Sequence, residues 1–186
     1  MLINPHQTAP GLLVAGPNIK DPFFSKSVVL MLEHNSEQAI GLVLNKTLPY
    51  ECESIVQEHF ELSWFGEQSL LLQGGPVAPQ SLWTVHEDGW KFEYTSVAPG
   101  VGVSRSLDSL RKLCRVETRR IRLIIGCAAW GAGQLEEEFH RGDWLFLPNF
   151  DPDLIFDVSV DDLWSSAIRH IGIDPMLLNE GNGELH

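Results

Sequence analysis

Residues 121–138 read IRLIIGCAAWGAGQLEEE, and this stretch contains three local signals in succession. Residues 121–125 are apolar except for Arg122 and rich in β-branched side chains, which predicts a buried strand. Small residues follow from Gly126 to Gly133 and predict a sharp turn. A helix over Gly133 to His140 then begins with glutamates at its positive end. A turn of this kind between a strand and a helix leaves backbone amides free to bind a ligand.

Short apolar runs elsewhere in the chain predict further strands. Each run is bounded by Gly, Pro, Asn or charged residues, and several are apolar at consecutive positions, which is typical of strands covered on both faces. The runs are Leu12–Ala15, Val28–Leu32, Ile40–Leu44 and Leu70–Leu72. Residues 33–37, Glu-His-Asn-Ser-Glu, predict a hairpin connection between the second and third runs.

Helical spacing of apolar residues appears between these runs. Residues 106–116 carry one apolar stripe after a candidate N-cap at Ser104 or Ser106, and 160–171 carry another that ends at Gly172. A weaker helix is predicted over 54–60, a long surface loop over 97–102, and a frayed tail from about residue 177. The mixture predicts one compact α/β domain over residues 1–186, with a mixed β-sheet that contains hairpins and is flanked by helices.

Composition and charge restrict the class of partner. The 186 residues suit one domain, and the formal net charge is -12. From Gln134 to His186 there are 12 acidic residues against Arg141 and Arg169, so this third of the chain repels phosphate backbones. This charge disfavours nucleic acid and an anionic membrane surface as partners.

The cysteines and the N-terminal residues predict a cytoplasmic protein. Cys52, Cys114 and Cys127 are odd in number and widely spaced, which suits a reducing compartment. The first residues lack the basic and apolar regions of a signal peptide. No stretch approaches the ~20 apolar residues of a membrane helix.

Several segments, taken in order, resemble the bacterial AlgH/YqgE family. They are residues 11–15 (GLLVA), 21–29 (DPFFSKSVV), 41–45 (GLVLN), 74–77 (GGPV), 126–136 (GCAAWGAGQLE) and 164–175 with its closing Gly-Ile-Asp-Pro. The resemblance implies a compact α/β fold with a mixed sheet. It also implies a regulatory role, since members are often labelled transcriptional regulators, although no DNA-binding motif underlies that label here. The family usually has a Tyr-Ala-Gly-Trp-Gly-Pro-Gly type of run where this chain has Cys127, Ala129 and Ala132, so the roles of that hydroxyl and those glycines do not carry over.

The glycine-rich turns are the first candidates for a ligand site. Neither nucleotide fingerprint is met, because Ala132-Gly133 follows Gly131 where a P-loop needs Lys-Ser/Thr, and Glu136 replaces the third glycine of a Rossmann run. The glutamates at 136–138 favour an uncharged or polar ligand over a phosphate. The simpler interpretation is that both turns serve only the fold, and a ligand-binding turn is the sharper alternative. The candidate ligand-binding residues are Asn45, Gly74, Gly75, Pro76, Trp130, Gly131, Gly133 and Gln134.

No catalytic residue, metal ligand or cofactor is assigned. Cys127 stands near the place of a nucleophile elbow, but Ile125 is too large for the position two residues before it, so a small buried hydrophobe is the better reading. The seven histidines form neither H-x-x-x-H nor H-E-x-x-H.

A basic cluster offers a second candidate surface. Seven of the 13 basic residues lie between Arg105 and Arg122. A solvated helix face explains such a cluster, and a patch for an acidic partner, including the acidic third of another copy, is the sharper reading. The candidate patch residues are Arg111, Arg115, Arg119, Arg120 and Arg122.

These observations favour a non-enzymatic regulatory or interaction protein that acts through an unknown protein partner or a small ligand. Two alternatives stay open. One is a small hydrolase-like enzyme with its site near Gly74–Pro76 and Cys127–Gln134, and the other is a DNA-binding regulator that uses Arg105–Arg122. An oligomer is compatible with either role.

Overall fold

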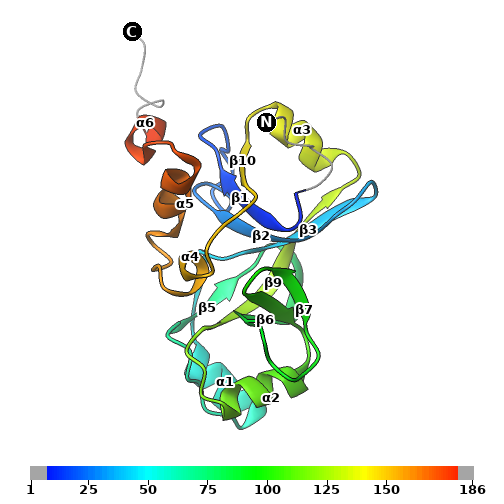
Figure 1. Cartoon of the computed structure of the whole chain (residues 1–186), viewed down its shortest axis with the longest axis vertical. Coiled ribbons are helices and arrows are strands. Elements are labelled where there is room, and N and C mark those ends of the chain that lie inside the picture. The colour runs from blue at the N-terminus through cyan, green and yellow to red at the C-terminus, as the bar shows by residue number, and fades with distance from the viewer. Residues whose placement is uncertain (1–7, 180–186) are drawn as a thin grey trace.

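The computed structural model describes residues 8–179. Strand β9 (Ile121–Gly131) organises the sheet, because it is the strand through which the two halves of the sheet are joined. Its last residues pair with β3 (Gln38–Val43), from Gln38 opposite Gly131 to Gly41 opposite Ala128. Its first residues pair with β6 (Val77–Glu87) in antiparallel and with β5 (Leu70–Gln73) in parallel orientation. In Figure 1, β9 runs through the centre of the molecule between these two groups of strands.

The ten described strands form one mixed sheet in the order β10-β1-β2-β3-β9-β6-β8-β7, with β4 and β5 as a branch on β9. On one side of β9 the outer strands are β1 (Gly11–Ala15), β2 (Val28–His34) and β10 (Trp144–Leu147). On the other side they are β4 (Thr47–Glu51), β7 (Thr95–Ala98) and β8 (Val101–Ser104). The predicted mixed sheet with hairpins is therefore confirmed.

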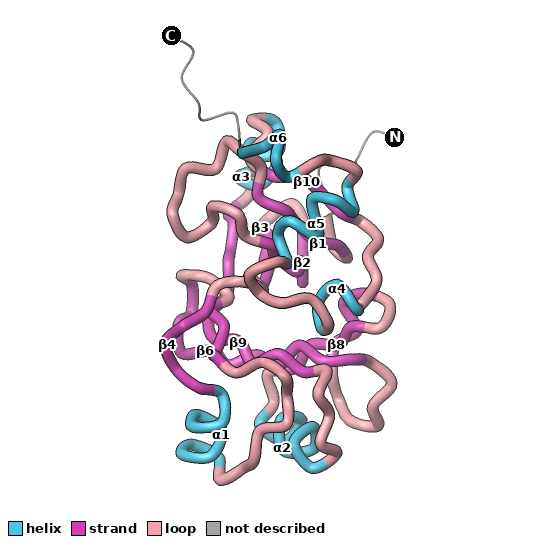
Figure 2. The backbone as a smooth tube through the Cα atoms, turned by 90° about the vertical axis from the view of Figure 1, so that its left-hand side faces the viewer, coloured by secondary structure: helices cyan, strands magenta, loops and turns pink. Residues whose placement is uncertain are grey.

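The helices divide between the two halves. Helices α1 (Cys52–Phe60) and α2 (Leu107–Arg115) lie together at one end of the molecule in both Figure 1 and Figure 2. Helix α3 (Gln134–His140) follows β9 directly. The remaining helices accompany the β1–β2 half in Figure 1, and they are α4 (Asp153–Phe156), α5 (Leu163–Ile171) and α6 (Pro175–Asn179).

Two hydrophobic clusters correspond to this division. Both faces of β9 are buried, because Ile124 packs in the larger cluster with β1 and β2 whereas Leu123 packs in the smaller one with α1 and α2. Arg122 is a buried exception among these apolar neighbours at 6 % exposure.

The prediction that a turn begins at Gly126 is wrong. The strand continues to Gly131, because β3 and β6 supply backbone partners for the small residues. Gly126 has φ of 74° inside the strand, and a Cβ there would lie 2.6 Å from the carbonyl oxygen of Gly75. The small residues thus let two backbones approach and kink the strand; they do not form an elbow.

The predicted long loop over residues 97–102 is also wrong, because it is a tight hairpin between β7 and β8 with Gly100 at φ of 78°. Helix α5 begins at Leu163, later than predicted, since residues 159–162 form a turn held by Ser159 and Asp162. The predicted tail begins inside α6, and residues 180–186 lie outside the described part of the chain. Within residues 8–179 no helix has the length and apolarity to cross a bilayer.

Candidate functional site

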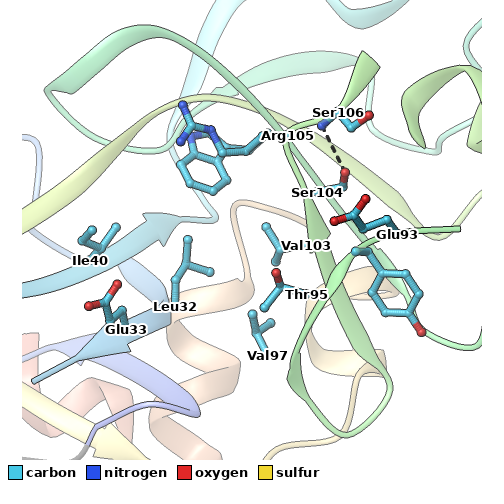
Figure 3. A pocket seen from close by; sticks show the side chains of 12 residues that line it. Leu32, Glu33, Ile40, Glu93, Thr95, Val97, Val103, Ser104, Arg105 and Ser106 are labelled. Carbon is cyan, nitrogen blue, oxygen red and sulfur yellow. Dashed lines mark hydrogen bonds between the residues drawn. The ribbon is translucent and has the colours of Figure 1, made fainter. Parts of the chain in front are cut away.

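A cavity of about 620 Å³ opens between the β2–β3 hairpin and the β7–β8 hairpin. Leu32 and Ile40 form one wall, and Val97 and Val103 face them from the other side, as Figure 3 shows. We call this cavity the Trp83 pocket. Its volume and its apolar walls fit the general character of small-molecule sites, which are mostly apolar and carry few polar groups.

Arg105 supplies the pocket with a positively charged group held in a defined position. Its Cζ lies 4.6 Å from the centre of the Trp83 ring, and Nη2 donates to Ser81 Oγ at 3.2 Å. Figure 3 shows Arg105 at one side of the cavity. A guanidinium held flat on an aromatic face keeps its remaining N–H groups in a planar fork that suits a carboxylate.

Other polar groups surround the apolar walls. Ser104 Oγ accepts from the backbone N–H of Ser106 at 3.1 Å, and Ser106 Oγ caps α2 by accepting from Asp108 and Ser109. The carboxylates of Glu33 and Glu93 lie at opposite sides of the cavity (Figure 3). Two carboxylates beside one cation disfavour a dianion more strongly than a ligand with a single negative charge.

The sequence did not indicate this pocket, because its residues come from five separate strands and the segments beside them. Arg105 belonged to the basic cluster, but nothing in its spacing connects it to Leu32 or Ile40. Strand β6, which carries Trp83, gave no signal in the sequence either, because Pro79 and polar residues interrupt its apolar pattern.

Three of the predicted ligand-binding residues meet at a different cavity of about 260 Å³. Pro76, Trp130 and Gln134 line it together with Phe24 and Trp144. We call this cavity the Trp130 pocket. The rings of Trp130 and Trp144 are 6.0 Å apart at 81°, and Phe24 meets Trp144 at the same distance and angle.

Glu138 connects the walls of the Trp130 pocket. Its Oε2 accepts from Trp130 Nε1 at 2.8 Å and from Trp144 Nε1 at 2.7 Å, while Oε1 accepts from Gln134 Nε2 at 3.0 Å. Because both oxygens of Glu138 already accept these hydrogen bonds, its role is to fix the positions of the two indole rings.

The other predicted ligand-binding residues, at positions 45, 74, 75, 131 and 133, lie outside the lining of the Trp130 pocket. Asn45 accepts from the N–H of Val28 and donates to the carbonyl oxygen of Lys26, so it holds the start of β2. Gly74 donates to Ile125, and a Cβ on Gly75 would lie 2.3 Å from the backbone of Cys127. Gly131 and Gly133 lie at the junction of β9 and α3, where an added Cβ meets open space.

The five arginines of the predicted patch do not form one surface. Arg111 and Arg115 are exposed on α2, and Arg119 pairs with Glu67 at 3.5 Å. Arg120 pairs with Asp153 and Asp157 beside α4. Arg122 is buried and donates to the carbonyl oxygen of Phe156 at 2.6 Å. Residues from the acidic C-terminal third of the same chain thus contact Arg120 and Arg122.

The thiols and the buried histidine are in environments that favour their neutral forms. Burial raises the pKa of Cys52 to about 12 and that of Cys114 to about 11, and it raises the pKa of Cys127 against the opposing charge of Arg105. Burial also lowers the pKa of His86. Within residues 8–179, no group of three or more His, Cys, Asp or Glu side chains is placed to hold a metal ion.

Comparison with known proteins gives a consistent result over the whole chain. The family model described as AlgH-like matches residues 12–176. A UPF0301 protein of Myxococcus xanthus is 36% identical over 176 residues, which is 94% of this chain and 97% of that protein. A UPF0301 protein of Xanthomonas axonopodis pv. citri is 33% identical, over 98% of this chain and 99% of its own.

Two solved structures have the same fold. The solution structure of the AlgH protein from Pseudomonas aeruginosa aligns with a TM-score of 0.74 and 26% identity over 100% of both chains. A crystal structure of a protein from Corynebacterium diphtheriae aligns with a TM-score of 0.72 and 25% identity, over 96% of this chain and 93% of that one.

Proposed function

This chain belongs to the AlgH-like family, and from that premise we propose that it is a non-enzymatic, cytoplasmic regulatory protein that binds a small anionic ligand in the Trp83 pocket. The observation that carries the proposal is Arg105, whose guanidinium is stacked on Trp83 beside an apolar cavity of about 620 Å³. A mostly apolar cavity with a few polar groups in defined positions is the usual form of a ligand site.

The ligand class follows from the lining. The aliphatic side chains of Leu32, Ile40, Val97 and Val103 suit an apolar body, and Arg105 suits its carboxylate. Glu33 and Glu93 disfavour a dianion such as a phosphate monoester. We therefore expect a small amphipathic monocarboxylate.

A binding role is supported over a catalytic one by the state of the nucleophile candidates. Cys127 is 7 % exposed within β9, and burial raises its pKa, which disfavours the thiolate that nucleophilic attack requires. His86 is fully buried, and burial lowers its pKa. The cytoplasmic assignment rests on three buried cysteines that are all free thiols, as a reducing compartment allows.

A thermal-shift screen against aliphatic and aromatic monocarboxylates, phosphorylated metabolites and nucleotides tests the proposal. A ligand at ~100 times its dissociation constant stabilises the folded state by about 2.7 kcal/mol. For a domain of this size the melting temperature rises by roughly 5–10 °C. We expect the hits to be monocarboxylates.

Arg105→Gln then tests the site, with Arg111→Gln as the matched control on exposed α2. We expect Arg105→Gln to weaken a monocarboxylate hit at least about 10-fold, because a charge-assisted hydrogen bond contributes about 1.5–3 kcal/mol. Arg111→Gln should bind like the parent chain. Equal binding by both variants, or a screen without any carboxylate hit, would overturn the proposal and direct attention to a protein partner.

A further inference from the structure

A separate cavity of about 470 Å³ lies beside the start of β4 and β5, where the segment from α4 to α5 covers it. Arg122 lines it from β9, together with Phe156, Asp157 and Asp161 from that segment. We call it the Arg122 cavity. Apart from Arg122, none of its lining residues is basic, and it shares no lining residue with the Trp83 pocket.

Arg122 is a buried cation whose hydrogen-bond capacity is incompletely used. Its side chain belongs to a residue that is only 6 % exposed, and Nη2 donates to the neutral carbonyl oxygen of Phe156 at 2.6 Å. Its Nη1 is buried and has no hydrogen-bond partner. Burial lowers the pKa of Arg122, and the charges of Glu67 and Asp157 oppose this.

A buried guanidinium that pairs only with a carbonyl oxygen is costly, because desolvation of a charge is repaid only by a counter-charge or a full set of hydrogen bonds. The nearest arginines show the contrast. Arg119 pairs with Glu67 at 3.5 Å and Arg120 with Asp157 at 3.6 Å, whereas Arg122 has a neutral partner. A carboxylate in the cavity, which Arg122 lines, would supply the counter-charge that this guanidinium lacks.

The rim of the cavity has the opposite charge. Glu67, Asp157 and Asp161 are all exposed there. Glu67 and Asp157 already pair with Arg119 and Arg120, so among the described residues Asp161 is the rim carboxylate without an ion pair, and it is placed to attract a cationic group. Leu70, Val158 and Val160 add apolar surface to the lining.

We propose that the Arg122 cavity binds a zwitterion of the α-amino-acid class with an apolar side chain, whose carboxylate meets Arg122 and whose ammonium meets Asp161 at the rim. The inference is independent of the Trp83 pocket, since it uses other residues and another ligand class.

Isothermal titration with a matched ligand series tests the inference on the intact chain. The series is L-leucine, isovalerate (which lacks the ammonium), isoamylamine (which lacks the carboxylate) and inorganic phosphate. We expect leucine to bind at least about 10-fold more tightly than each of the others, because only leucine satisfies both ends of the cavity.

Two variants locate the site. Arg122→Met keeps the length of the buried stem and should weaken leucine binding at least about 10-fold, whereas Arg115→Met, at an exposed position on α2 outside the lining, should bind like the parent chain. Asp161→Asn changes an exposed rim position, so it should fold normally. We expect it to weaken leucine about 2–5-fold and to leave isovalerate unchanged.

Three results would overturn the inference. They are the absence of leucine binding at ~10 mM in the parent chain, phosphate binding more tightly than leucine, and leucine binding that Arg122→Met leaves unchanged. If Arg122→Met does not fold, the ligand series and Asp161→Asn decide, and an Asp161→Asn variant that binds leucine like the parent chain counts against the proposal.

Discussion

The side-chain amide of Gln68 pairs with the backbone of Leu123 as a neighbouring strand would. Gln68 Oε1 accepts from the N–H of Leu123 at 2.9 Å, and Nε2 donates to the carbonyl oxygen of Leu123 at 2.8 Å. The parallel pairing of β5 with β9 covers Leu72 to Gln73 and does not reach Leu123. One buried side chain, just before β5 begins, thus continues the pairing with β9 and satisfies two backbone groups that water cannot reach.

Gln68→Ala should destabilise the fold by about 2–4 kcal/mol, because it leaves the N–H and carbonyl of Leu123 without partners in the interior. Urea unfolding followed by circular dichroism measures the change. Gln57→Ala, on the exposed face of α1, is the control and should stay within about 0.5 kcal/mol of the parent chain. An equal effect of both substitutions would contradict the role assigned to Gln68.

Glu138→Ala should destabilise by about 2–4 kcal/mol, since it removes the shared acceptor of two buried indole N–H groups, those of Trp130 and Trp144. Urea unfolding followed by circular dichroism measures the change. Glu137→Ala, at the exposed neighbouring position, should be close to neutral. A neutral Glu138→Ala would show that the indoles find other partners.

Gly75→Ala should destabilise by at least about 2 kcal/mol or prevent folding, because the added Cβ would lie 2.3 Å from the backbone of Cys127, which cannot move without displacing β9. Gly131→Ala places its Cβ in open space and serves as the control. The soluble yield and the thermal midpoint of the two variants, compared with those of the parent chain, test this prediction. A Gly75→Ala protein as stable as Gly131→Ala would contradict the close approach of the two backbones.

Stability should fall as the pH drops below about 6.5, the ordinary pKa of histidine, because burial lowers the folded-state pKa of His86. The unfolded chain then takes up a proton that the folded chain does not bind, so acid favours unfolding. Glu87 and Asp88 oppose this effect of burial without overcoming it.

His86→Gln should reduce this loss of stability between pH 7 and pH 5, as measured by urea unfolding at each pH. His59→Gln, at an exposed position on α1, should keep the slope of the parent chain. If His86→Gln leaves the slope unchanged, other groups that titrate in this range are responsible.

Much of the secondary structure was predictable because it depends on local patterns. The strands at 12–15, 28–32 and 121–125 are confirmed, since consecutive apolar residues mark strands that are covered on both faces. The cap of α2 by Ser106 and the end of α5 at Gly172, with φ of 90°, are confirmed for similarly local reasons. Strand β6 was missed, since Pro79 and polar residues interrupt its apolar pattern and β9 supplies its backbone partners.

The candidate sites depended on contacts between distant segments. Pro76, Trp130 and Gln134 were singled out from their turns and do line one cavity, but Phe24 and Trp144, which complete its walls, gave no sign of that in the sequence. The Trp83 pocket was not indicated at all. Arg122 and Arg119 looked equivalent in the basic cluster, although one is buried and the other is a surface ion pair.

The sequence by itself determined the family, the mixed α/β character and the positions of most of the core strands, because these follow from motifs and from hydrophobic patterns over a few residues. Only the tertiary structure decided which face of β9 each residue occupies, which backbone groups Gln68 satisfies and where cavities open. The physical reason is that burial, desolvation and cavity shape depend on segments far apart in the chain. Arg122 is a cation in an apolar run, and the sequence does not show whether it is buried or exposed. The tertiary structure buries it, because Phe156 and the acidic segment after it lie against its side chain.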